Sequence, residues 1–183
     1  MSLIPKIGIT GAPRVGKTEG IIKVIRRLEN IYNFGGMITK SIEENGIRVG
    51  FKIIDWLTKE EKIFAHVQFD TPYRVGKYKV DLKVLNNFGI PAIEKAIYEK
   101  NVDIVVIDEV GKMELESKKF KETVREALDC EKPVLLTLHK KSRDSLLQDI
   151  RNMSNVRILE ITSINRNFLP YKIEKLLKEE WQP

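Results

Sequence analysis

Eight consecutive residues, Gly11 to Thr18, constrain this chain more than any other part of its sequence. They fit the pattern G-x-x-x-x-G-K-[ST] of a phosphate-binding loop. A short apolar strand with Ile7 and Ile9 precedes them, and an amphipathic segment follows. In such a unit the loop glycines let successive backbone N–H groups point at phosphate oxygens, and the positive end of the helix adds to the attraction. The octet therefore predicts a nucleotide-phosphate site within an α/β fold.

The last two residues of the loop have the most specific expected roles. Lys17 is expected to reach the β- and γ-phosphates of a nucleotide, and the Thr18 hydroxyl to ligate Mg²⁺. A glycine turn that arose by chance would leave both side chains unexplained. The residues predicted to bind nucleotide here are those of the whole loop: Gly11, Ala12, Pro13, Arg14, Val15, Gly16, Lys17 and Thr18.

Two acids follow an apolar strand in the middle of the chain. Residues 102–107 predict a central parallel strand covered on both faces, and Asp108 and Glu109 come directly after it. Ligands of open α/β sheets bind at this carboxyl end of the strands. Asp108 is therefore expected to reach Mg²⁺ through a bound water, and Glu109 to act as the base that polarises an attacking water. Taken alone, two such acids would also suit an ordinary polar loop, and some P-loop kinases carry acids near this point.

Predicted strands and helices alternate along the chain. This alternation is typical of a parallel sheet with right-handed crossovers, so we predict one α/β domain over residues 1–183 with helices flanking the sheet. Strands are expected over residues 6–10, 35–39, 102–107, 134–138 and 156–161. Helices are expected over residues 18–31, 85–100, 117–128, 142–153 and 167–181.

Two apolar-rich segments, residues 47–55 and 62–69, interrupt the alternation. The polar stretch 58–61 joins them, which predicts an antiparallel hairpin inserted at one edge of the sheet. Residues 70–84 contain a Thr-Pro pair, Gly76 and many charges, and are predicted to form a loop.

Composition excludes several classes of function. The single cysteine, Cys130, rules out an internal disulfide, and no Cys/His cluster could hold zinc. No apolar run approaches membrane-spanning length and no signal-peptide pattern is present, so we expect a cytoplasmic protein without a membrane partner. The net charge of +6 could attract polyanions, but basic and acidic residues interleave along the chain. Binding of nucleic acid therefore stays open but is not favoured, and a monomer is expected.

Residues 108–115 read Asp-Glu-Val-Gly-Lys-Met-Glu-Leu. This octet resembles the D-E-[IV]-G-K-M-E-L signature of small P-loop nucleoside-triphosphatases known from thermophiles and, in vertebrates, as the cancer-related nucleoside-triphosphatase. Residues 49–54, 74–80, 90–96 and 165–167 resemble other stretches of that family in the same order. The resemblance implies a RecA-like P-loop fold and Mg²⁺-dependent hydrolysis of ATP, GTP and other nucleoside triphosphates to the diphosphate and phosphate, with little base selectivity.

The resemblance also implies site residues. Gly11, Gly16, Lys17, Thr18, Asp108 and Glu109 match the family's functional positions. Gly111 lies in the octet and is added to the predicted nucleotide-binding set. Lys77 and Arg166 match positions that are basic in the family, so either is expected to contact nucleotide or to steady transition-state charge. Two solvated surface cations are the alternative for this pair.

Three residues depart from the family pattern. Arg14 stands where the family usually has glycine, so the backbone there must tolerate a Cβ, and the guanidinium points either to the γ-phosphate or to solvent. Glu19 replaces a common Thr or Ser, and Lys40 replaces a frequent acid. His139 or Thr137, at the end of a strand expected beside the acidic one, could sense the γ-phosphate. A structural histidine is the alternative reading of His139.

Two other functions compete with hydrolysis. A kinase of a nucleotide or other small molecule could use the basic segment with Lys140, Lys141, Arg143 and Arg151 as a lid, given an acceptor pocket from which water is excluded. A nucleic-acid-associated P-loop module would show salt-sensitive affinity for DNA or RNA. A guanine-specific switch is disfavoured, because no N-K-x-D motif follows a strand.

Overall fold

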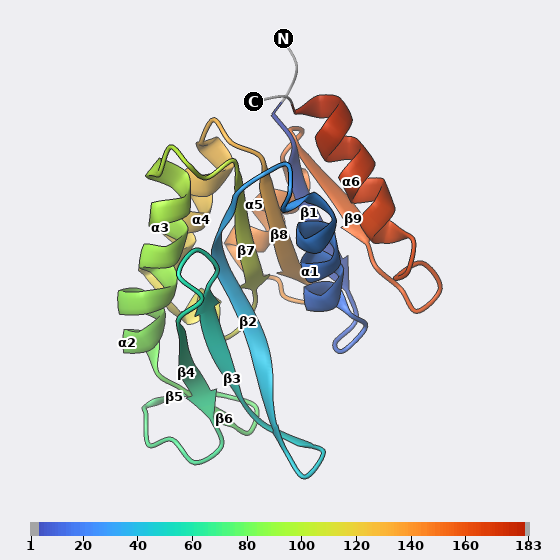
Figure 1. Ribbon diagram of the computed structural model, residues 1–183. Coiled ribbons are helices and arrows are strands. Elements are labelled where there is room, and N and C mark those ends of the chain that lie inside the picture. The colour runs from blue at the N-terminus through green and yellow to red at the C-terminus, as the bar shows by residue number, and fades with distance from the viewer. Residues whose placement is uncertain (1–3, 182–183) are drawn as a thin grey trace.

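The computed structural model describes residues 4–181, and its centre is a nine-stranded sheet in the order β5-β6-β4-β3-β2-β7-β8-β1-β9 (Figure 1). The strands are β1 (Lys6–Gly11), β2 (Phe34–Glu44), β3 (Ile47–Asp55), β4 (Glu61–His66), β5 (Tyr73–Val75), β6 (Tyr78–Val80), β7 (Ile104–Val110), β8 (Val134–His139) and β9 (Val156–Glu160). The helices are α1 (Lys17–Leu28), α2 (Leu82–Val84), α3 (Ile90–Tyr98), α4 (Lys118–Asp129), α5 (Ser145–Asn152) and α6 (Leu169–Glu180).

The strands β2, β7, β8, β1 and β9 are parallel to one another, as the alternation predicts. Strand β7 shows why this part forms a covered sheet. Val105 and Ile107 pack into the core beneath α3, α4 and α5, whereas Ile104 and Val106 pack into the core beneath α1 and α6. All four side chains are fully buried. Both faces of the strand are therefore apolar, and helices lie on both sides of the sheet (Figure 1).

The antiparallel part of the sheet is larger than predicted. The predicted hairpin is confirmed as β3 and β4, and it pairs with β2, which continues to Glu44 rather than ending at Thr39. The prediction of a loop over residues 70–84 is wrong, because this stretch contains β5, β6 and α2. The two strands have three residues each around a turn at Gly76, whose φ is +60°. Such short strands show no periodicity from which they could be recognised.

Several predicted helices begin or end a few residues away from their observed bounds. The helix predicted over 142–153 begins at Ser145, because the Asp144 carboxylate accepts a hydrogen bond from the Leu146 N–H and caps it. The helix predicted over 85–100 is preceded by α2, capped by Asp81, and by a π turn at Leu85–Gly89. The Ser117 hydroxyl accepts a hydrogen bond from the Phe120 N–H and caps α4. None of the helices within residues 4–181 combines the length and apolarity that crossing a membrane requires.

Candidate functional site

The loop between β1 and α1 has the tight geometry that its sequence predicts. An added Cβ at Gly11 would lie 2.7 Å from the Ile161 carbonyl oxygen, so the strand end leaves room only for glycine. Arg14 has a φ of +62°, in the left-handed region that L residues rarely adopt. Glycine adopts this conformation freely, whereas arginine there carries a local backbone cost of about 1 kcal/mol.

Lys17 turns back across the loop. Its Nζ donates to the Gly11 carbonyl at 3.2 Å and lies 3.5 Å from the Ala12 carbonyl. The ammonium group therefore lies over the curled backbone, where phosphate-binding loops hold the β- and γ-phosphates.

Asp108 joins the two sequence motifs. Its side chain is fully buried at the carboxyl end of β7; Oδ2 accepts a hydrogen bond from the Thr18 hydroxyl at 2.8 Å, and Oδ1 accepts one from the Thr137 hydroxyl at 2.6 Å. The Thr39 hydroxyl donates to the Asp108 backbone carbonyl at 2.8 Å. Strands β2 and β8 flank β7, so one acid is held by a hydroxyl from each neighbouring strand and from α1. Burial raises the pKa of Asp108 to about 7.

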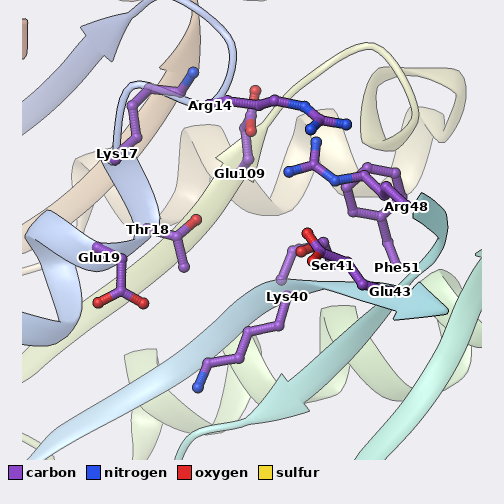
Figure 2. A pocket seen from close by; sticks show the side chains of 12 residues that line it. Arg14, Lys17, Thr18, Glu19, Lys40, Ser41, Glu43, Arg48, Phe51 and Glu109 are labelled. Carbon is purple, nitrogen blue, oxygen red and sulfur yellow. The ribbon is translucent and has the colours of Figure 1, made fainter. Parts of the chain in front are cut away.

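Glu109 follows as a half-buried side chain that faces the loop (Figure 2). It lines two cavities that meet beside the loop. The first, named the phosphate cavity, has a volume of about 470 Å³ and is lined by Gly16, Lys17 and Thr18 together with residues of β2 and β3. The second, named the apolar cavity, has a volume of about 390 Å³ and extends from Glu109 toward Phe64 and Val75.

The oxygen atoms of Thr18 and Asp108 are suitable ligands for Mg²⁺. The Thr18 hydroxyl and the Asp108 carboxylate are hard oxygen donors that already touch each other. Within residues 4–181 no set of three or more His, Cys, Asp or Glu side chains could hold a metal by itself. Mg²⁺ suits a site of this kind, because it is usually bound through one or two protein oxygens with waters and substrate phosphates completing its shell.

Comparisons with known proteins agree with this geometry. The model of a protein family described as NTPase matches residues 6–174. The chain is 47% identical over 173 residues to the nucleoside-triphosphatase THEP1 of Thermotoga sp. (strain RQ2), which covers 94% of this chain and 95% of that one. The chain belongs to this nucleoside-triphosphatase family. It is accordingly an enzyme, a nucleoside-triphosphate phosphatase.

Two solved structures of the nucleoside-triphosphatase family share the fold. The crystal structure of THEP1 from the hyperthermophile Aquifex aeolicus matches with a TM-score of 0.85 and 33% identity, over 94% of this chain and 99% of that one. The solution structure of a human cancer-related nucleoside triphosphatase matches with a TM-score of 0.82 and 29% identity, over 97% of this chain and 100% of that one. The predicted α/β fold and the predicted family are both confirmed.

The remaining predicted residues of this nucleoside-triphosphatase lie in different places. Gly111 lines the apolar cavity, and an added Cβ there would lie 3.1 Å from Glu109 Oε1. Arg166 lines a third cavity of about 380 Å³ on the other side of the loop, with Val15 and Gly16. Lys77 is exposed at the turn between β5 and β6, 5.4 Å from the Tyr78 ring centroid, and lines none of these three cavities. The roles of these three residues stay predictions.

Residues of the β8–α5 connection are held by the chain itself. His139 Nδ1 accepts from the Lys141 and Ser142 N–H groups at 3.2 and 3.0 Å, and burial lowers the pKa of His139. Arg151 donates to the carbonyls of His139 and Ser142 at 2.7 and 3.0 Å. These contacts give His139 and Arg151 a structural role, although His139 also lines the apolar cavity.

Sequence reasoning did not single out Arg48 or Glu114 as site residues. Arg48, on β3, lines both cavities beside Glu109, and its Nε is buried with no hydrogen-bond partner in the part of the chain that the structure describes. Figure 2 shows Arg14 and Arg48 extending toward the same region from opposite sides. Glu114 is 4% exposed and lines the apolar cavity. Arg48 could have been recognised from its position two residues before Gly50-Phe51, and Glu114 from its position in the octet of residues 108–115.

Proposed function

We propose that this nucleoside-triphosphatase hydrolyses Mg²⁺-bound ATP, GTP and other nucleoside triphosphates to the diphosphate and phosphate, with little base selectivity. The observation that carries the proposal is the junction of Thr18 and Asp108, with Glu109 beside it facing the loop. When bound, Mg²⁺ would neutralise charge on the β- and γ-phosphate oxygens, and Thr18 and Asp108 are the residues that would hold it.

Different residues of the chain bind the phosphates, activate the attacking water and stabilise the developing charge. Lys17 and the N–H groups of the loop bind the β- and γ-phosphates, and Thr137 holds Asp108 in place from the neighbouring strand. Glu109 orients a water for in-line attack on the γ-phosphorus and accepts its proton. Arg14 from the loop and Arg48 from β3 on the opposite side supply positive charge to the phosphate cavity, where charge gathers on the transferring group.

Weak base selectivity follows from the third cavity. The loop continues into α1 there, which is where the nucleoside end of a bound triphosphate leaves the phosphates. Besides the loop residues Arg14, Val15 and Gly16 and the helix residue Gly20, the cavity is lined by four exposed polar residues: Glu19, Lys23, Arg166 and Asn167. Long exposed side chains make few fixed hydrogen bonds, so they distinguish poorly between bases.

The cytoplasmic location and the monomeric state expected from the sequence stay predictions.

Steady-state release of orthophosphate from Mg·ATP and Mg·GTP, with no acceptor added, tests the proposal. Glu109→Gln should lower kcat by about 10²–10⁴-fold, because the water loses its base, while a fluorescent ATP analogue still binds. Glu116→Gln is the matched control, since it makes the same change at an exposed residue outside the two cavities. Full turnover in Glu109→Gln would remove Glu109 as the base, and binding of both nucleotides without release by the wild type would remove the hydrolytic function.

A further inference from the structure

The apolar cavity is larger than hydrolysis requires. It shares six lining residues with the phosphate cavity: Arg14, Lys17, Thr39, Arg48, Phe51 and Glu109. A molecule in the apolar cavity would therefore lie directly beside the γ-phosphate that Lys17 binds. Hydrolysis needs one water at that place, and a water occupies only about 30 Å³ of liquid volume. The cavity of about 390 Å³ has room for a second substrate.

The floor of this cavity is apolar. Phe51, Phe64, Val75 and Met113 come from three different strands and from the segment after β7, and Phe64 is fully buried. An apolar floor with a few polar groups converging on it is the usual construction of a site for a small organic molecule. Phenylalanine rings favour flat rings as partners, because offset stacking adds to simple burial.

The mouth of the cavity carries positive charge. Arg14 and Arg48 line it, and among residues 4–181 neither forms an ion pair with a carboxylate. The Arg48 guanidinium lies 5.3 Å from the Phe51 ring centroid, so the cation stands at the border between the apolar floor and the phosphate cavity. Guanidinium groups bind phosphate oxygens in a bidentate manner, which makes a phosphate group a fitting ligand at this border.

Glu114 adds a hydrogen-bonding group deep in the cavity. Its Oε2 and the Oε1 of Glu109 lie 3.0 and 3.1 Å from the position that a Cβ at Gly111 would take, so the two carboxyl groups flank the same glycine. Burial, and then the charge of Glu109, raise the pKa of Glu114 well above its usual range. A protonated carboxyl group can both donate and accept a hydrogen bond, as recognition of a ring with nitrogen and oxygen substituents requires.

We propose that the apolar cavity binds a nucleoside monophosphate as a phosphoryl acceptor, with the ring on the Phe51–Phe64 floor, Glu114 beside the ring and the phosphate between Arg14 and Arg48. The proposal rests on the nucleotide placement of the proposed function. A phosphate oxygen of the monophosphate forms a bond to the γ-phosphorus as the bond from that phosphorus to the β,γ-bridging oxygen breaks. Triphosphate and monophosphate become two diphosphates, and no proton has to move because the acceptor phosphate is already ionised near neutral pH.

The absence of a proton transfer gives a sharp test. Wild type and Glu109→Gln are incubated with Mg²⁺ and γ-³²P-labelled ATP, with and without AMP, GMP, CMP, UMP or dTMP, and the labelled products are separated. We expect labelled diphosphate from at least one monophosphate. Its rate should fall less than threefold in Glu109→Gln, whereas the release of labelled orthophosphate falls by about 10²–10⁴-fold.

A second variant pair locates the acceptor. Val75→Trp should fill the cavity at its far end and lower the rate of transfer by about tenfold or more. Tyr73→Trp adds bulk on the same strand outside the cavity and should leave transfer intact. Binding of a fluorescent ATP analogue shows that each variant has folded.

The possible failures can be told apart. Orthophosphate release without labelled diphosphate from any of the five monophosphates would overturn the acceptor site and leave the proposed function standing. Transfer that survives in Val75→Trp, or that Tyr73→Trp loses to the same extent, would overturn the placement of the acceptor in this cavity. Absence of both products in the wild type would overturn the proposed function together with this inference.

Discussion

Each end of the parallel sheet buries an ionisable side chain, and the two side chains have different hydrogen-bond partners. At the amino end Lys6, on β1, is 5% exposed, and its Nζ donates to the carbonyls of Ala127, Cys130 and Lys132 at 3.3, 2.7 and 2.6 Å. At the carboxyl end Asp108 is fully buried and receives two hydroxyl groups. Burial lowers the pKa of Lys6 and raises that of Asp108, so both charges are costly.

The difference lies in what satisfies each charge. The three carbonyls around Lys6 belong to the end of α4 and the segment after it. The hydrogen bonds of the ammonium group are therefore made within the fold, without a ligand. The carboxyl end instead gathers Asp108, Glu109 and Glu114, and burial together with the charge of Glu109 raises the pKa of Asp108 and of Glu114. A bound cation would relieve this repulsion. Charge at the amino end thus satisfies groups of the fold itself, whereas the carboxyl end is where we propose that the ligand binds.

Asp108→Asn should produce the largest difference between the two ends. The amide keeps the shape of the side chain and can still bond Thr18 and Thr137, but it removes the negative charge that would hold Mg²⁺. We expect kcat/KM for Mg·ATP to fall by about 10²–10³-fold. Phosphate release measured across a Mg²⁺ titration checks this, and an unchanged Mg²⁺ dependence in the variant would contradict it.

The pH dependence of stability gives the next largest effect. The folded pKa of Asp108, about 7, lies above its unfolded value of 3.8, so its favourable contribution is complete below pH 3.8 and is lost as pH rises through about 7. In EDTA, wild type should therefore lose up to about 4 kcal/mol of unfolding free energy relative to Asp108→Asn between pH 4 and pH 8. Urea unfolding at several pH values measures this difference. Parallel curves for the two proteins would show that Asp108 ionises normally.

Lys6→Met should affect stability alone. It leaves three carbonyls at the amino end without their donor, so the free energy of unfolding should fall by about 2 kcal/mol. Turnover per folded molecule should not change, because Lys6 lies at the opposite end of β1 from the loop. Lys118→Met is the control, since the Lys118 side chain is 92% exposed. A loss of turnover in Lys6→Met larger than its loss of folded protein would contradict the claim that Lys6 affects stability alone.

Arg14→Gly should give the smallest effect. Glycine adopts a φ of +62° without the Cβ clash, so Arg14→Gly should be more stable than Arg14→Ala by about 1 kcal/mol. Equilibrium unfolding of the two variants side by side measures this difference. Equal stabilities would mean that the loop relaxes to another conformation in these variants.

The sequence predicted the parts of this molecule that depend on neighbours along the chain. The loop Gly11–Thr18 and the apolar run before Asp108 are local patterns, and both were found from sequence, although β7 spans Ile104–Val110 and so includes the two acids rather than ending before them. The meeting of Thr18 with Asp108 followed from a general rule, because the carboxyl ends of parallel strands share one edge of the sheet.

Residues whose role depends on distant contacts could not be predicted. Arg48 reaches the site only because β3 pairs with β2 and β2 with β7, a register that no local pattern contains. The burial of Glu114 likewise arises from the packing around it. The short strands β5 and β6 were missed for the same reason, since they are stabilised by pairing with β4 and with each other.

The most direct test of the contrast between the two ends is ligand stabilisation of three proteins: wild type, Lys6→Met and Asp108→Asn. Their melting temperatures are measured with EDTA alone and with a saturating Mg²⁺ complex of a non-hydrolysable ATP analogue. At a hundred times the dissociation constant the ligand should raise the melting temperature of wild type and Lys6→Met equally, by roughly 5–10 °C, and that of Asp108→Asn by less than half as much. An equal rise in Asp108→Asn, or a lost rise in Lys6→Met, would contradict the assignment of ligand binding to the carboxyl end.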